Sequence, residues 1–199
     1  MERFIRVGVF LLCLVPFAWT VYAAVTGGLG PDPAEALMHV TGEWSLRILA
    51  LTLLISPLRA WTGWAVLMKL RRMLGLYAFF YGCIHLLSFL QFFIGWTPAA
   101  LAEELVERPY ITVGFGAWLL MLPLAITSTR GMQRRLRRNW QRLHRLVYPA
   151  AVLACLHLLW QARSDIGEAL VYIGVFAMLL GWRLKRRYQR QRAPAIARA

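Results

Sequence analysis

Six apolar stretches, each close to the length of a helix that crosses a bilayer, account for most of the 199-residue chain. A hydrocarbon core about 30 Å thick requires about 20 helical residues per crossing. Membrane β-barrels instead show segments of about 10 residues with alternating polarity, which this sequence lacks. We therefore expect an all-α membrane protein, a six-transmembrane-helix bundle with short loops, folded as a single domain over residues 1–199. The expected helices cover residues 7–25, 43–59, 73–95, 110–128, 145–161 and 168–184.

Basic residues are distributed unevenly between the segments that connect these helices. With a cytoplasmic N-terminus, 20 of the 23 lysines and arginines fall on the cytoplasmic side, and Arg47, Arg108 and Arg163 fall on the other. Of the nine acidic residues, all except Glu2 fall outside. Because lysine and arginine are retained on the cytoplasmic face, the pattern predicts cytoplasmic N- and C-termini. The net charge of +14 is then a topology signal first and a contact for anionic membrane lipid second. We expect no binding of nucleic acid.

The connecting segments are short and lack nucleotide-binding motifs. The sequence has no G-x-G-x-x-G after a strand, no P-loop and no C-x-x-C pair. Pro33 can open a short interfacial helix before the second span, and the segment 97–110 is amphipathic enough to lie on the membrane surface. If the protein moves electrons, a separate partner must supply or accept them. The chain is therefore interpreted as one subunit of a larger system.

His85 and His157 lie near the middle of two apolar stretches, where an ionisable side chain is costly and indicates a functional site. Each follows the basic start of its helix by about 13 residues, which places both about 20 Å from the inner boundary. Two imidazoles at equal depth on different helices can be the fifth and sixth ligands of one haem iron. Gly82 and Ala154, three positions earlier, share the histidine faces and leave room for a flat macrocycle. The alternative is a pair of buried histidines bonded to carbonyls, with the small residues serving helix packing.

Three further residues are candidates for cofactor binding. His144 lies at the inner membrane surface and is a candidate ligand of a second haem iron, but position 72 of the third helix, where a partner ligand would stand, is an arginine. His144 can also contact a flavin or quinone, or be an interfacial residue. Arg47 suits the propionates of an outer haem and Arg72 suits an inner cofactor, because a guanidinium pairs well with carboxylates. Snorkelling to the interface is the alternative for both arginines.

Short motifs follow one another along the chain in a fixed order: GGLGPDP, HVTG, LLISPLR, RRMLGL, ERPYITVG, AITSTRGMQRRL and W-x-x-LHRLVY, together with the His85 and His157 segments. In this order they resemble the MsrQ (YedZ) family, the haem-binding membrane subunits of the periplasmic methionine sulfoxide reductase system. That family belongs to the ferric-reductase-like transmembrane superfamily. The resemblance spans about residues 10 to 187, nearly the whole chain.

The resemblance implies a multi-pass protein of the bacterial inner membrane that carries one haem b, with a second haem left open, and also FMN. Electrons would come from the quinone pool or a cytosolic flavin reductase. They would pass to a periplasmic molybdopterin enzyme, MsrP, which reduces methionine sulfoxide in oxidised proteins. The family's histidines correspond to His85, His144 and His157. The sequence leaves two other functions open: a stand-alone membrane ferric or quinone reductase, and a cofactor-free transporter or assembly factor.

Overall fold

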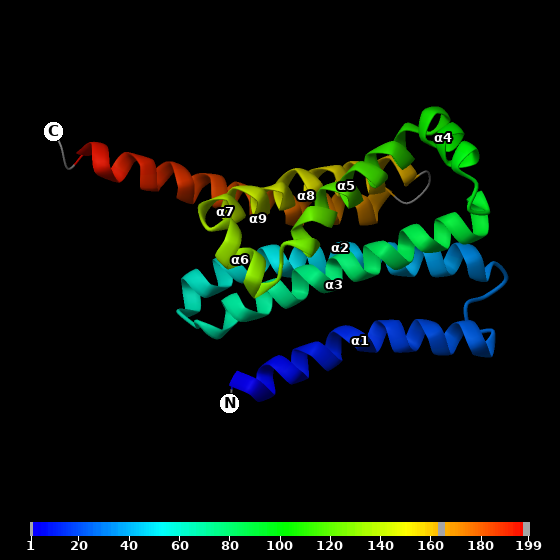
Figure 1. Ribbon diagram of the computed structural model, residues 1–199, viewed down its shortest axis with the longest axis horizontal. Coiled ribbons are helices and arrows are strands. Elements are labelled where there is room, and N and C mark those ends of the chain that lie inside the picture. Colours follow the sequence, from blue (N-terminus) through cyan, green and yellow to red (C-terminus); the bar gives the residue numbers. More distant parts are fainter. Residues whose placement is uncertain (1, 163–165, 197–199) are drawn as a thin grey trace.

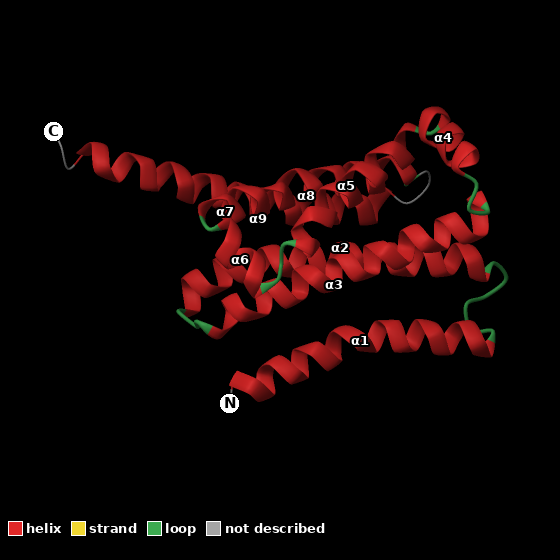
Figure 2. Ribbon diagram, viewed as in Figure 1, coloured by secondary structure: helices red, strands yellow, loops and turns green. Residues whose placement is uncertain are grey.

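The computed structural model describes residues 2–162 and 166–196, and these residues form helices joined by short turns, with no strand among them (Figure 2). Six of these helices are long, and they lie alongside one another (Figure 1). They are α1 (Glu2–Thr26), α2 (Pro33–Thr62), α3 (Val66–Phe89), α5 (Pro109–Ile126), α8 (Val147–Gln161) and α9 (Ile166–Ile196). Shorter elements connect them: the π-helix η1 (Leu90–Ile94), α4 (Pro98–Glu107), α6 (Arg130–Leu136), α7 (Arg138–Leu143) and the 3-10 helix η2 (His144–Leu146).

Five helical segments among the described residues are long and apolar enough to cross a membrane. These are α1, α3 with η1, α5, the segment Arg138–Gln161 and the segment Ile166–Gln189. The chain is therefore a multi-pass membrane protein. The remaining long helix, α2, carries Glu43, Arg47 and Arg59, which reduce its mean hydropathy although it lies among the other five (Figure 1).

The helix α2 is longer than the span expected at residues 43–59. Asp32 caps its N-terminus by accepting a hydrogen bond from the Glu35 N–H at 3.0 Å, and Pro33 occupies the first turn, where a missing N–H is harmless. The expected interfacial helix and the expected span are thus one continuous helix. It runs through Pro57 and ends at Gly63, whose φ of 73° is a left-handed conformation that favours glycine.

Two helix pairs, α2 with α3 and α5 with α8, make the most extensive contacts in the molecule. Three alanines of these helices, Ala78, Ala150 and Ala151, are fully or almost fully buried, and small side chains let helix backbones approach closely. The Ser45 hydroxyl donates to the Ala78 carbonyl across the first pair at 2.8 Å. In lipid such packing and hydrogen bonding replace the hydrophobic effect as the source of helix association.

The helix α1 packs at one side of the bundle (Figure 1) and is fixed there by a tyrosine. The Tyr81 hydroxyl accepts from the Phe17 N–H at 2.9 Å and donates to the Cys13 carbonyl at 2.8 Å. In an unbroken helix these two backbone groups would hydrogen-bond to each other. The Tyr81 hydroxyl is therefore inserted into the backbone hydrogen bonds of α1 beside Pro16. Insertion of a side chain next to a proline is a physical cause of a helix kink.

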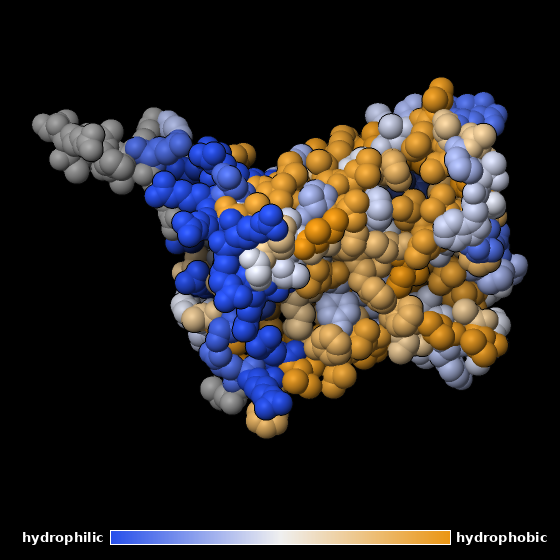
Figure 3. Space-filling view, viewed as in Figure 1, coloured by the Kyte–Doolittle hydropathy of each residue, from blue (hydrophilic) through white to orange (hydrophobic). Residues whose placement is uncertain are grey.

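The surface divides into a basic end, an apolar belt and a second polar end (Figure 3). The N- and C-terminal parts of the described chain lie at the basic end together with α6 and α7 (Figure 1). At the opposite end lies α4, which carries Glu103, Glu104 and Glu107. Large apolar side chains on α1, such as Leu12 at 72% exposure and Trp19 at 67%, remain uncovered. Such side chains suit contact with lipid rather than water.

Candidate functional site

The imidazole of His85 lies between α3 and α2. Its Nδ1 is 2.9 Å from the Met38 carbonyl oxygen of α2, and because a carbonyl only accepts, Nδ1 must carry the proton. The ring lies directly over Gly42: a Cβ at that position would be 2.9 Å from Nδ1. Gly42 therefore makes space for the imidazole, and the hydrogen bond leaves Nε2 with a free lone pair.

The imidazole of His157 has equivalent surroundings between α8 and α5. Its Nδ1 is 2.7 Å from the Tyr110 carbonyl oxygen, and a Cβ on Gly114 would be only 2.7 Å from the same nitrogen. The Tyr110 ring also stacks on the imidazole, with centroids 6.2 Å apart. This hydrogen bond again fixes the tautomer in which Nε2 is free to bind a metal ion.

The two imidazoles converge on one another across the bundle. Their ring centroids are 6.1 Å apart and their planes are inclined by 76°. The structure therefore brings together the two histidines that the sequence placed at equal depth. No group of three or more His, Cys, Asp or Glu side chains suited to a metal ion occurs within residues 2–162 and 166–196. His85 and His157 can therefore bind a metal ion whose other ligands belong to a cofactor.

These two environments are related by an internal repeat that the sequence reasoning missed. His85 contacts the carbonyl of Met38 and His157 that of Tyr110, in each case 47 residues earlier in the chain. Gly42 and Gly114 follow these carbonyl residues by one helical turn. The three members of the second set follow their counterparts by 72 positions: Met38 and Tyr110, Gly42 and Gly114, His85 and His157. Aligning the whole chain with itself at this offset pairs Gly42 with Gly114 as it pairs His85 with His157, but it does not show that the glycines contact the rings.

Gly82 does not contribute open space next to His85. A Cβ on Gly82 would lie 3.3 Å from the Ser45 Oγ and 3.4 Å from the Met121 Cε. The glycine therefore allows α3 to pack closely against α2 and α5, which matches the packing alternative considered for this residue. The glycines that accommodate the imidazoles are on the opposing helices instead.

His144 lies apart from the pair, in η2 before α8. Its ring stacks on Trp140 with centroids 3.9 Å apart, and its Nδ1 is 3.1 Å from the Trp140 carbonyl oxygen. The residue at the corresponding position of the repeat is Arg72, which is half-buried near the start of α3. His144 and Arg72 therefore do not form a second pair of imidazoles, and their roles toward a cofactor stay predictions.

Arg47 is engaged in a polar cluster between α2 and α9. Its Nη2 is 2.7 Å from the Glu43 carboxylate and 4.0 Å from the Glu168 carboxylate, and its Nε donates to the Tyr172 hydroxyl at 2.9 Å. The guanidinium also lies 5.1 Å from the Trp44 ring centroid. A propionate at this position would compete with Glu43, so the expected contact of Arg47 with a haem stays a prediction.

Comparison with known proteins defines the family. The family model for the ferric reductase like transmembrane component matches residues 41–155. The "Protein-methionine-sulfoxide reductase heme-binding subunit MsrQ" of Xanthomonas euvesicatoria pv. vesicatoria is 51% identical over 177 residues, covering 89% of this chain and 81% of that protein. The protein of the same name from Rhodospirillum rubrum is 46% identical over 195 residues, covering 96% of this chain and 93% of that protein.

The chain belongs to the MsrQ family. The region matched by the ferric-reductase-like model begins one residue before Gly42 and includes His85 and His144, but it ends two residues before His157. The match to the MsrQ protein of Rhodospirillum rubrum covers nearly the whole chain. No solved structure matches the chain, so the arrangement of the two histidine environments is known from the present structure.

Proposed function

We propose that this MsrQ-family chain is a b-type cytochrome, with His85 and His157 as the two axial ligands of one haem iron. The observation that carries the proposal is the 6.1 Å separation of the two imidazole centroids. Metal–imidazole bonds are about 2.0–2.1 Å long, so two imidazoles on one metal ion have centres about 6 Å apart. The relatives from Xanthomonas euvesicatoria and Rhodospirillum rubrum are named as heme-binding subunits, which supports the same cofactor.

The chain's own residues would bind, orient and shield this group. The Met38 and Tyr110 carbonyls hold the imidazoles in the tautomer that presents Nε2, and such partners make the ligand more basic. Gly42 and Gly114 give both rings room. When bound, haem supplies a one-electron carrier whose potential depends on axial ligands and burial.

We further propose a single domain over residues 1–199 with six membrane crossings, α2 being the sixth, and with both termini cytoplasmic. Both terminal parts of the described chain lie at the basic end (Figure 1), and basic residues favour the cytoplasmic side. The membrane is then the bacterial inner membrane. His157 lies four residues before the end of α8, close to the opposite, periplasmic face.

Electrons would therefore leave the chain on the periplasmic side, toward a molybdopterin methionine sulfoxide reductase of the MsrP type. The sulfoxide is reduced on that partner, which supports repair of oxidised periplasmic proteins. Electrons would enter from the quinone pool or a cytosolic flavin reductase. We propose one haem b rather than two, because the counterpart of His144 is Arg72; FMN stays a prediction from the family resemblance.

The proposal is tested by a dithionite-reduced minus oxidised absorption spectrum of the purified chain, with haem quantified per protein. A b-type α-band is expected, and His85→Ala and His157→Ala should each abolish the low-spin signal. His39→Ala is the matched control, because His39 is exposed and its Nε2 lies 3.5 Å from the Glu35 carboxylate. Full signal in both ligand variants would refute the assignment.

The same preparation separates an electron conduit from a stand-alone reductase. The conduit should transfer electrons to a purified MsrP-type partner and show little turnover of a ferric chelate by itself. Rapid turnover of ferric chelate without any partner would favour the stand-alone reductase. A colourless protein from haem-supplied cells would instead favour a transporter or assembly factor.

A further inference from the structure

A cavity of about 760 Å³ opens at the basic end of the bundle, between α2, α3, α8 and α9. Five arginines from three of these helices line it. They are Arg59, Arg71, Arg183, Arg186 and Arg187. Guanidinium groups present planar sets of N–H donors that match the oxygens of phosphate and carboxylate. Neither His85 nor His157 lines the cavity, and the proposed function assigns it no role.

The arginines of this cavity have no anionic partner within the described residues. No carboxylate is among the residues that line the cavity. Glu2, the acidic residue at this end of the molecule, is paired with Lys69 at 2.5 Å. The other described acidic residues lie in the first half of α2 or just before it, on α4 and at the start of α9. A concentration of like charge without counterions favours binding of an external anion.

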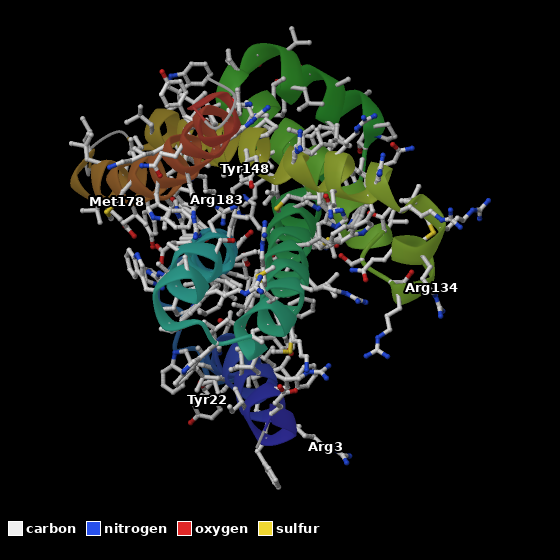
Figure 4. All side chains as sticks on the ribbon, turned by 90° about the vertical axis from the view of Figure 1, so that its left-hand side faces the viewer. Arg3, Tyr22, Arg134, Tyr148, Met178 and Arg183 are labelled. Atoms are coloured by element: carbon white, nitrogen blue, oxygen red, sulfur yellow. The ribbon has the colours of Figure 1, made fainter. Side chains whose placement is uncertain are left out.

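Arg183 shows that the site is built into the fold. Its guanidinium donates to the Tyr148 hydroxyl at 2.9 Å, to the Ser56 hydroxyl at 3.1 Å and to the Leu53 carbonyl. The Nε donor of the same side chain is buried without a hydrogen-bond acceptor. Arg71 interacts with the same tyrosine and faces the positive charge of Arg183. Viewed from the basic end, Arg183 and Tyr148 lie together between the helices, whereas Arg134 projects outward (Figure 4).

The depth of the cavity points to the source of the anion. It lies at the basic end of the bundle, which adjoins the apolar belt (Figure 3), and Trp182 is part of its wall. Trp61 and Trp64, at the nearby end of α2, are 73% and 64% exposed. Tryptophans concentrate at the headgroup level of a bilayer, and basic pockets between transmembrane helices bind anionic headgroups.

We propose that this arginine-lined cavity binds the phosphate group of an anionic phospholipid, with Arg183 and Arg71 at its base and Arg59 and Arg186 at its rim. The rim arginines are exposed and, unlike Arg183, are not hydrogen-bonded to the backbone of another helix in the described structure. Arg186 stacks at 5.0 Å on Trp182, which holds its charge beside the cavity. Lipid binding here would join α9 to the end of α2.

The test is native mass spectrometry of the full-length protein in a neutral detergent, titrated with phosphatidylglycerol or with phosphatidylcholine. The wild type should bind one phosphatidylglycerol in preference to phosphatidylcholine. The double variant Arg59→Gln/Arg186→Gln should bind phosphatidylglycerol about thirtyfold more weakly, since each basic residue near the surface contributes on the order of 1 kcal/mol to anionic-lipid binding. This readout is independent of haem, so its failure would leave the proposed function intact.

The matched control is Arg134→Gln/Arg135→Gln, which removes the same charge from exposed positions of α6 outside the cavity. Its affinity for phosphatidylglycerol should equal that of the wild type. Equal weakening in both double variants, or equal binding of both lipids, would overturn the proposal in favour of diffuse attraction. Displacement of the lipid by millimolar inorganic phosphate would overturn the lipid source and assign the cavity to free phosphate.

Discussion

Each imidazole of the central pair depends on a glycine in a neighbouring helix. The hydrogen bonds from His85 and His157 to helix carbonyls require each ring to lie against a helix backbone. A methyl group at Gly42 or Gly114 would occupy the position of the ring, because its carbon would be less than 3 Å from Nδ1. Real Cβ atoms do not approach neighbouring atoms that closely, so substitution must move the ring or the helix.

We expect Gly114→Ala to lower haem content and to broaden or shift the α-band. Overpacking of this kind costs about 1–3 kcal/mol, and here the strain falls on a proposed ligand. The matched control is Gly116→Ala in the same helix, where the added Cβ would meet Leu153 at an ordinary 3.6 Å. Haem per chain and the reduced spectrum measure the effect, and identical spectra for both variants would contradict it.

His144 is expected to behave differently from the pair. Its ring stacks on Trp140, and the repeat places Arg72, not a second imidazole, at the equivalent position. With a single haem bound by His85 and His157, His144→Ala should leave the haem-to-protein ratio unchanged. A fall to about half of the wild-type ratio by pyridine haemochrome would instead reveal a second haem.

At the level of single helices, α1 depends on a hydrogen bond from outside. Tyr81→Phe removes the hydroxyl that satisfies both the Phe17 N–H and the Cys13 carbonyl. Leaving buried polar groups unpaired should lower the free energy of unfolding by about 1–3 kcal/mol. Tyr77→Phe is the matched control because it removes a single bond, to the Phe10 carbonyl at 3.1 Å. Thermal unfolding in detergent measures both, and equal midpoints would contradict the bridging role.

For the molecule as a whole, the charge distribution predicts the orientation in the membrane. Green fluorescent protein fused after Ala199 should fluoresce, and alkaline phosphatase at the same position should be inactive, because the C-terminus is expected in the cytoplasm. Alkaline phosphatase fused after Trp96, in the turn between η1 and α4 at the end of the molecule opposite the basic end, should be active. An active phosphatase after Ala199 would reverse the proposed topology.

The sequence determined most of what is local. Apolar length set the positions of the six long helices, because a helix in lipid must satisfy its own backbone hydrogen bonds. The helix boundaries were predicted less accurately. The helix α2 begins ten residues before the expected span, because the helix capped by Asp32 continues into the span without a break. Counting residues along a helix of fixed rise also placed His85 and His157 at the same level, and their ring centroids lie 6.1 Å apart.

Tertiary structure decided which helix faces meet. In lipid both the buried and the exposed faces of a helix are apolar, so the contrast that orients a helix in water is missing. The sequence therefore could not show that Gly42 and Gly114, rather than Gly82, accommodate the imidazoles. Nor could it show that Arg47 is held by Glu43 and Tyr172.

The arginine cavity depends on the same kind of information. Arg183 donates to Ser56, which lies 127 residues earlier in the chain, and nothing in either local segment indicates that contact. Charge counting predicted a basic membrane face, because it needs only the order of helices and loops. The grouping of Arg59, Arg71 and Arg183 around one cavity arises only when α2, α3 and α9 pack together, since packing sets the rotation of each helix about its axis.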